Sequence, residues 1–190
     1  MTELQATFVD THQHLIERCK NNDPKAQMEV YKLYYKAMFN TCLRIVKDSM
    51  LAEDVMQEAF LTVFDKIKTY QGQSAFGAWL KRVVVNKALD ELKKKKLLFD
   101  SLETFVEVYK IEAEQAVSNE YEAEITNKIN NVKNALNQLP DGYRIVLSLY
   151  LFEGYDHEEI SQILKVTEST TRSQLTRAKQ KLIDILNKKI

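Results

Sequence analysis

The sequence is poor in residues that interrupt regular structure and in residues that cross-link it. Its 190 residues include only 4 glycines and 2 prolines, which favours helices over a turn-rich all-β fold. The cysteines, Cys19 and Cys42, show neither metal-ligand spacing nor a disulfide framework, which predicts a reducing, cytoplasmic setting. No apolar run reaches transmembrane length, and the first residues lack the basic-then-apolar pattern of a signal peptide. We therefore expect an all-α cytoplasmic protein without membrane insertion.

Signals of catalysis are missing as well. The chain has no phosphate-cradling glycine loop, no nucleophile elbow and no Cys–His pairing. The carboxylates between residues 53 and 58 share their face with no histidine, and no second carboxylate motif completes a metal site. The three histidines, His12, His14 and His157, are expected to face solvent. We predict no enzyme, no metal, no cofactor and no small-molecule substrate.

Capping signals divide the N-terminal part into three long helices after a short lead-in. Asp23 followed by Pro24 is a strong helix start, because Asp caps the free N–H groups and proline fits the first turn. The predicted helices run from 24 to about 47, from a cap at Asp48 or Ser49 to about 70, and from a cap at Ser74 to about 96. The apolar face predicted for the first helix consists of Met28, Tyr31, Tyr35, Met38, Phe39, Cys42, Ile45 and Val46.

The stretch from Leu51 to Phe64 has two different faces when it is placed on a helix. Its buried stripe is predicted to be Ala52, Val55, Met56, Ala59, Phe60, Val63, Phe64 and Ile67. The opposite face holds Asp54, Gln57, Glu58, Leu61 and Asp65. A leucine among carboxylates suits a docking surface for a basic, partly apolar partner. An ordinary surface helix with one exposed leucine explains the same spacing.

Equal totals of 27 basic and 27 acidic residues hide a segregation of charge along the chain. Between Lys81 and Lys96 the basic residues are Lys81, Arg82, Lys87, Lys93, Lys94, Lys95 and Lys96, against two acids. From Asp100 to Glu124 eight acids stand against the single base Lys110. We interpret the first run as a cationic surface, although a lysine run also complements a helix dipole. The second run predicts an acidic linker, residues 100–121, that is extended or weakly helical.

A second helical unit, residues 122–190, follows this linker. Its first apolar stripe, Ile125, Ile129, Val132, Leu136 and Leu139, stops at Pro140. A capping box between Asp156 and Glu159 begins a helix over 157–164, and Thr167 caps the last helix after a short turn. This is a helix-turn-helix pattern. Polar residues that point away from the apolar side of the last helix suit DNA: Ser169, Arg172, Ser173, Thr176 and Arg177. A helical hairpin with a solvated basic face remains an alternative.

Three segments together resemble the short, two-domain extracytoplasmic-function sigma factors of bacterial RNA polymerase. AEDVMQEAFLTVF resembles the family's core-polymerase-binding helix. Phe76, Trp79, Leu80, Asn86, Asp90 and the following lysines resemble the segment that reads and melts the promoter near the start site. LPDGYRIVLSLYLFEG, HEEISQIL and TESTTRSQLTRAKQKL resemble the C-terminal domain that binds the upstream promoter element. The resemblance spans about Asp23 to Leu186, and it implies a first domain at 1–99.

The resemblance also implies roles for particular residues. Asp54, Gln57 and Glu58, with Leu61 exposed among them, would contact the coiled-coil clamp helices of the polymerase's largest subunit. The loop Tyr70, Gln71, Gly72, Gln73 and Ser74 would hold a flipped base, with Asn86, Lys93 and Lys94 on nearby DNA. Ser169, Arg172, Ser173, Thr176 and Arg177 would face the upstream element, and an anti-sigma factor would regulate the protein. Thr171 and Gln174 replace the family's common Val and Arg, which leaves the upstream sequence open.

Two other classes of function fit part of the pattern. A stand-alone, dimeric helix-turn-helix regulator would bind DNA without polymerase, but it leaves the acidic face at Asp54, Gln57 and Glu58 without a role. A helical adaptor would bind protein only. Under the sigma factor interpretation, promoter-specific transcription requires core polymerase.

Overall fold

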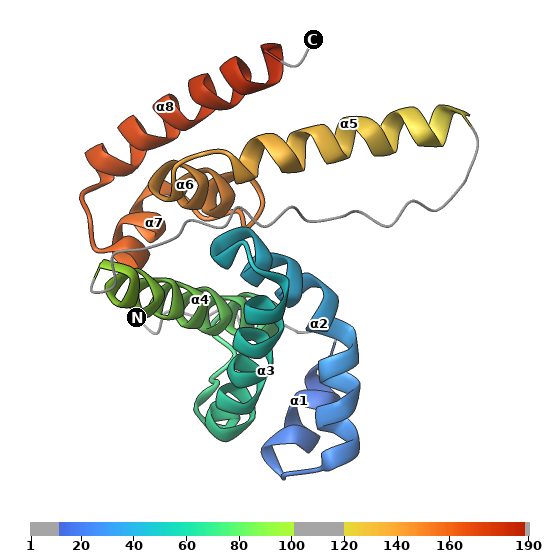
Figure 1. Cartoon of the computed structure of the whole chain (residues 1–190). Helices are drawn as coiled ribbons and strands as arrows, with labels where there is room; N and C mark the ends of the chain where they lie inside the picture. The colour runs from blue at the N-terminus through green and yellow to red at the C-terminus, as the bar shows by residue number, and fades with distance from the viewer. Residues whose placement is uncertain (1–11, 101–119, 189–190) are drawn as a thin grey trace, which may run out of the picture. The chain divides into compact units, whose positions relative to one another are not determined.

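The structure, a computed structural model, describes residues 12–100 and 120–188. Within these ranges all regular structure is helical, which confirms the all-α prediction (Figure 1). The chain divides into two compact units, residues 1–103 and 104–190. Nearly all of the predicted acidic linker lies outside the described residues. The domain limits 1–99 and 122–190 stay predictions, with α4 reaching Asp100 and α5 beginning at Glu120.

The first unit is a helical bundle built on three long helices. Its elements are α1 (Gln13–Lys20), α2 (Pro24–Val46), α3 (Ser49–Lys66), the 3₁₀ turn η1 (Ile67–Thr69) and α4 (Phe76–Asp100). The three long helices α2, α3 and α4 all pack against one another, and α1 contacts α2 and η1. Figure 1 shows these helices in one bundle. Each long helix has buried residues on one side and exposed residues on the other.

Side-chain caps start two of these helices where the sequence predicts. The Asp23 carboxylate accepts hydrogen bonds from the N–H groups of Lys25 at 2.9 Å and Ala26 at 3.4 Å. Asp48 accepts from the N–H of Leu51 at 3.0 Å. The predicted cap at Ser74 is wrong by one residue, since the carbonyl of Ala75 accepts the first bonds of α4.

The inner stripe of α3 forms much of this unit's core. Seven of the eight predicted positions are buried, namely Ala52, Val55, Met56, Ala59, Phe60, Val63 and Ile67, and Phe64 is half-buried. On α2 the prediction is wrong for Met28 and Tyr35, whose side chains are 53% and 45% exposed. The predicted positions Met38, Cys42, Ile45 and Val46 are buried, and Tyr31 and Phe39 are half-buried. Ala26 and Val30 complete the buried face of α2 in its first turns.

The second unit consists of α5 (Glu120–Asn137), α6 (Asp141–Leu151), α7 (His157–Leu164) and α8 (Glu168–Asn187). Helix α8 packs against the other three, which makes it the central element. The predicted stripe is buried at Leu136, in α5, and at Leu139, just after the helix. Ile125, Ile129 and Val132 are exposed, because the N-terminal half of α5 extends beyond the helices that cover its end (Figure 1).

Asp23 makes the stability of the first unit sensitive to acid. Its carboxylate accepts from Arg18 Nε at 2.8 Å and from two backbone N–H groups, and the Arg18 bond above all lowers the pKa of Asp23. A depressed folded-state pKa adds stability above the unfolded value of about 3.9, and this stability is lost as pH falls through the folded pKa. Asn in place of Asp keeps an oxygen for the cap and loses the ion pair.

We therefore expect Asp23→Asn to lower the thermal unfolding midpoint at neutral pH and to match the unchanged protein in acid. Thermal melts followed by circular dichroism over a pH series would measure the difference. A gap between the two proteins that stays constant down to about pH 2, below the ordinary range for Asp, would contradict the role of the ionised carboxylate.

Candidate functional site

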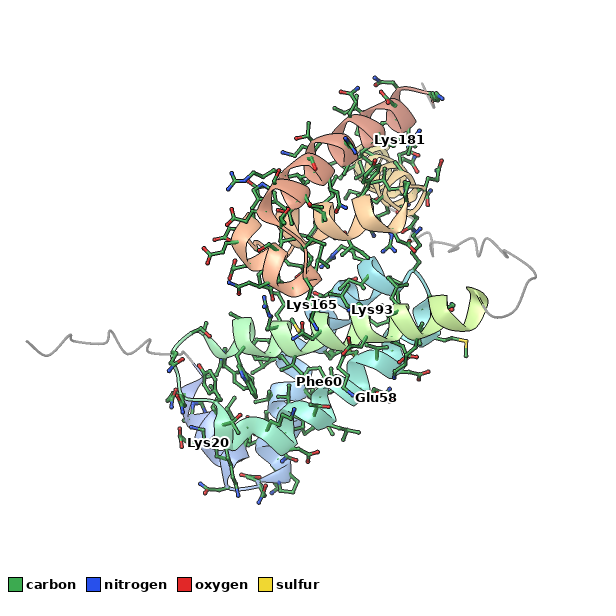
Figure 2. All side chains as sticks on the ribbon, turned by 90° about the vertical axis from the view of Figure 1, so that its left-hand side faces the viewer. Lys20, Glu58, Phe60, Lys93, Lys165 and Lys181 are labelled. Atoms are coloured by element: carbon green, nitrogen blue, oxygen red, sulfur yellow. The ribbon has the colours of Figure 1, made fainter. Side chains whose placement is uncertain are left out.

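The outer face of α3 carries the polar residues that the sequence places opposite the core. Asp54, Gln57 and Glu58 are exposed, and the Leu61 side chain among them is 66% exposed. Figure 2 labels Glu58 together with Phe60, two residues further along α3 and buried. Lys87 of α4 lies with its Nζ 3.4 Å from a Glu58 carboxylate oxygen. The α3 outer face, as we call these four residues, is thus acidic, partly apolar and open to a partner.

The loop between η1 and α4 is closed by Tyr70. Its side chain is 4% exposed, and its hydroxyl donates to the carbonyl of Ser74 at 2.6 Å. The ring centroids of Phe76 and Trp79 each lie 5.4 Å from that of Tyr70. Gly72 has φ +73°, a conformation that glycine adopts without strain. Tyr70 is therefore a buried support of the loop. The loop side chains that face solvent are those of Gln71, Gln73 and Ser74.

Lys20 of α1 adds a charge beside this loop. Its Nζ lies 5.9 Å from the centroid of the Tyr70 ring and 3.0 Å from a carboxylate oxygen of Glu17. Sequence patterns do not predict this neighbourhood, because Lys20 and Tyr70 are 50 residues apart and are brought together by the packing of α1 on η1.

On α4 the candidate DNA residues form a strip along the helix. Asn86 and Lys93 are exposed and seven residues apart, so they share one face, and Lys94 lies beside them. With a rise of 1.5 Å per residue, the strip extends about 12 Å along the helix axis from Asn86 to Lys94. Part of its charge is balanced locally, since Lys94 Nζ lies 3.0 Å from Glu91 and Lys93 Nζ 3.9 Å from Asp90. Figure 2 labels Lys93 on this helix.

Helices α7 and α8 form the predicted helix-turn-helix. Both bonds of the capping box are present, with Glu159 N–H to Asp156 at 2.8 Å and Asp156 N–H to Glu159 at 2.9 Å. Lys165 takes the left-handed conformation, φ 57°, at the end of α7, and Thr167 caps α8. The five predicted DNA residues, Ser169, Arg172, Ser173, Thr176 and Arg177, are all exposed along α8. Arg172 is held by Glu168 at 2.7 Å, one turn earlier.

Two polar residues of this unit have surroundings that the sequence did not predict. His157 is half-buried, stacked on Tyr150 at 5.0 Å between centroids and 3.0 Å from the buried Thr171 hydroxyl, so its predicted exposure to solvent is wrong. The Arg144 side chain is 1% exposed and pairs with Asp141 at 2.8 Å. Burial lowers the pKa of Arg144, and the Asp141 carboxylate opposes that change.

Two kinds of site are absent from the described parts of the chain. Residues 12–100 and 120–188 hold no cluster of three or more His, Cys, Asp or Glu side chains arranged to bind a metal ion. No helix in these ranges combines the length and the apolar character needed to cross a membrane.

Comparison with known protein families places both units. Residues 30–97 match Sigma-70 region 2, and residues 129–182 match Sigma-70 region 4. The first range includes the α3 outer face, the Tyr70 loop and the α4 strip, and the second includes the helix-turn-helix.

Similar proteins cover nearly the whole chain. The RNA polymerase sigma-H factor of Pseudomonas aeruginosa is 30% identical over 88% of this chain and 90% of its own length. The ECF RNA polymerase sigma-E factor of Escherichia coli K12 is also 30% identical, over 90% and 91%. The sigma factor RpoE of Bartonella quintana, solved in complex with the anti-sigma factor NepR, shares the fold with a TM-score of 0.64 at 22% identity, over 84% of this chain and 96% of that one.

The chain therefore belongs to the sigma factors of RNA polymerase, in their extracytoplasmic-function group. It is a specificity subunit that directs core polymerase to promoters, and it is not an enzyme. Membership decides against the stand-alone regulator and the adaptor, which the sequence pattern alone left open.

Proposed function

We propose that three surfaces of this sigma factor divide the work of promoter recognition. The α3 outer face docks on the clamp helices of the largest polymerase subunit. The Tyr70 loop and the α4 strip engage the downstream promoter element, and α8 reads the upstream element. The observation that supports docking most directly is the 66% exposure of Leu61 beside the exposed Asp54, Gln57 and Glu58, because an apolar side chain among acidic and polar groups suits a basic, partly apolar partner.

Docking through the α3 outer face follows from its chemistry. A basic, partly apolar partner helix would cover Leu61 and pair with the carboxylates of Asp54 and Glu58. Glu58 already has Lys87 at 3.4 Å, but the Glu58 side chain is largely exposed and that of Lys87 is only half-buried, and a pair so open to solvent contributes little free energy. A basic group of the polymerase replaces Lys87 as the partner of Glu58 with little loss of free energy.

Replacing Asp54 and Gln57 together by Ala is expected to weaken binding to core polymerase about thirtyfold, because two hydrogen bonds of about 1 kcal/mol each are lost. Binding of labelled protein to core polymerase, followed by fluorescence anisotropy, measures this. The matched control is Gln13→Ala with Glu17→Ala, an exposed amide and carboxylate on α1. Equal affinity of both double variants would contradict docking through α3.

Capture of a flipped base by the loop depends on a fixed loop shape. Unstacking a base costs a few kcal/mol, which contacts in the pocket and with polymerase must offset. The bond from the Tyr70 hydroxyl to Ser74 and the ring packing on Phe76 keep the loop in one conformation. Gln71, Gln73 and Ser74 then supply the polar groups that meet the base, and Asn86, Lys93 and Lys94 meet the nearby backbone.

Tyr70→Phe removes this hydroxyl and keeps the ring. We expect the fraction of open promoter complexes to fall roughly threefold to tenfold, the effect of one lost hydrogen bond, while initial binding of holoenzyme to the duplex is unchanged. Permanganate reactivity of unpaired thymines measures opening. Tyr35→Phe, on an exposed ring of α2, is the control, and normal opening by Tyr70→Phe would refute the role of the loop shape.

Recognition of the upstream element rests on the exposed side of α8. Small hydroxyl side chains at Ser169, Ser173 and Thr176 allow the helix to approach a duplex closely, and Arg172 and Arg177 reach base edges or phosphates. The Glu168 carboxylate holds Arg172 in place before DNA arrives.

Arg177→Ala is expected to reduce transcription from promoters with an intact upstream element by roughly tenfold to a hundredfold, the range for one good arginine–base contact. Run-off transcription with reconstituted holoenzyme measures it. Lys128→Ala, which removes an exposed charge on α5, should have little effect. Loss of the same size in both variants would point to general electrostatic attraction instead of readout.

Regulation by an anti-sigma factor is also part of the proposal. The Bartonella quintana structure contains a sigma factor bound to such a protein. A partner that covers the α3 outer face would prevent docking on polymerase. Because the polymerase is the obligatory partner, we place this protein in the cytoplasm.

A further inference from the structure

The first residue of α7 is tied to both of the helices that neighbour it in the second unit. The His157 ring stacks on Tyr150 of α6, with 5.0 Å between centroids and 28° between planes. Its Nδ1 lies 3.0 Å from the hydroxyl oxygen of Thr171 on α8. Lys179, two turns further along α8, places its Nζ 5.6 Å from the Tyr150 ring centroid. A single imidazole therefore links α6, α7 and α8.

The direction of the hydrogen bond follows from the surroundings of Thr171. A threonine hydroxyl has one hydrogen, and at Thr171 this hydrogen goes to the carbonyl of Glu168 at 2.8 Å. The oxygen is left as an acceptor, so Nδ1 of His157 carries the proton that it receives. Thr171 is 0% exposed, which keeps water from replacing the histidine. The Thr171 hydroxyl thus has its donor on α7 and its nearer acceptor on α8, while the carbonyl of His157, at 3.5 Å, is a longer alternative acceptor on α7.

The position of this bond lets it constrain the angle between α7 and α8. The turn at Lys165 joins α7 to α8 at one point and leaves the angle between the helices to other contacts. The bond from His157 to Thr171 is a second point, and it acts on the first turns of α8. The same turns carry Ser169, Arg172 and Ser173, and Glu168 both accepts from Thr171 and holds Arg172.

We infer that His157 is a positioning residue for upstream-element readout, which sets the angle of α8 through its bond to Thr171. The inference rests on the proposed role of α8. His157 contacts no base itself. Thr171 then acts inside the domain, as the buried acceptor for His157, and not at the DNA surface.

The test uses full-length protein in reconstituted holoenzyme, on a promoter identified by run-off transcription of genomic fragments. The measured quantity is the ratio of transcription from the intact promoter to transcription from the same promoter with a scrambled upstream element. His157→Phe keeps a ring on Tyr150 and removes the donor, whereas His157→Asn keeps a donor near the Nδ1 position and removes the ring. Thr171→Val removes the acceptor with little change of shape.

We expect His157→Phe and Thr171→Val each to lower the ratio by roughly threefold to tenfold, the size of one hydrogen-bond contribution. The double variant should lose no more than either single variant, because both remove the same bond. His157→Asn, which keeps a donor, should show most of the transcription ratio of the unchanged protein. Thermal melts establish that each variant is folded, and Thr171→Val carries the test alone where His157→Phe does not fold.

Two results would overturn the inference. One is an unchanged transcription ratio in both single variants together with a lower melting temperature, because the bond would then contribute to stability only. The other is additive loss in the double variant. Arg177→Ala, measured beside them, distinguishes failure of the proposed role of α8 from failure of the role of His157. If Arg177→Ala also keeps the transcription ratio, the role of α8 is wrong. If Arg177→Ala alone lowers the ratio, only the role of His157 is wrong.

Discussion

Burial of the inner stripe of α3 between α2 and α4 is the constraint on which the first unit depends. Ala52 and Ala59 are fully buried, and their small side chains let the neighbouring helices approach closely. Because a helix repeats every 3.6 residues, placing Ala59 and Phe60 in the core turns Glu58 and Leu61 outward. The α3 outer face is thus fixed by the core, and because the helix backbone is already ordered, a partner that binds there has only the side chains left to order.

The second unit depends in the same way on α8, which every other helix of the unit contacts. Helix α7 has only 8 residues, too few to be stable alone, so its capping box and its packing on α8 must hold it. The exposed residues of α8 gain their geometry from this packing. A helix α8 that shifted on α7 would move Arg172 and Arg177 together, so under the proposed role of α8 the internal contacts at Thr171 would affect readout.

Local rules predicted much of this structure. The caps at Asp23, Asp48 and Thr167, the capping box, and the two faces of α3 all depend on neighbours within a few residues, which the sequence displays directly. The incorrect predictions concern residues whose surroundings depend on contacts between helices that are distant in the sequence. Periodicity identifies the apolar stripe of α5 but not how far its neighbours extend, so Ile125 and Ile129 were assigned to the core. Exposure of the candidate residues on α3 and α8 followed from the stripes; the surroundings of Tyr70 and His157 did not.

The zero net charge of the chain matters physically because acidic side chains lie close to the lysines of α4. The α4 lysines have acidic neighbours on their own helix and on α3, with Lys94 near Glu91, Lys87 near Glu58 and Lys95 within 3.6 Å of Asp48. Each exposed pair is weak, yet together they reduce the positive potential that would attract DNA phosphates. Under the proposed function, free protein then gains little from nonspecific DNA. A polymerase that occupied Glu58 would remove the carboxylate that balances Lys87, so the proposed docking through α3 would raise the positive potential along α4. In this proposal, acidic and basic surfaces on adjoining helices link promoter binding to the presence of polymerase.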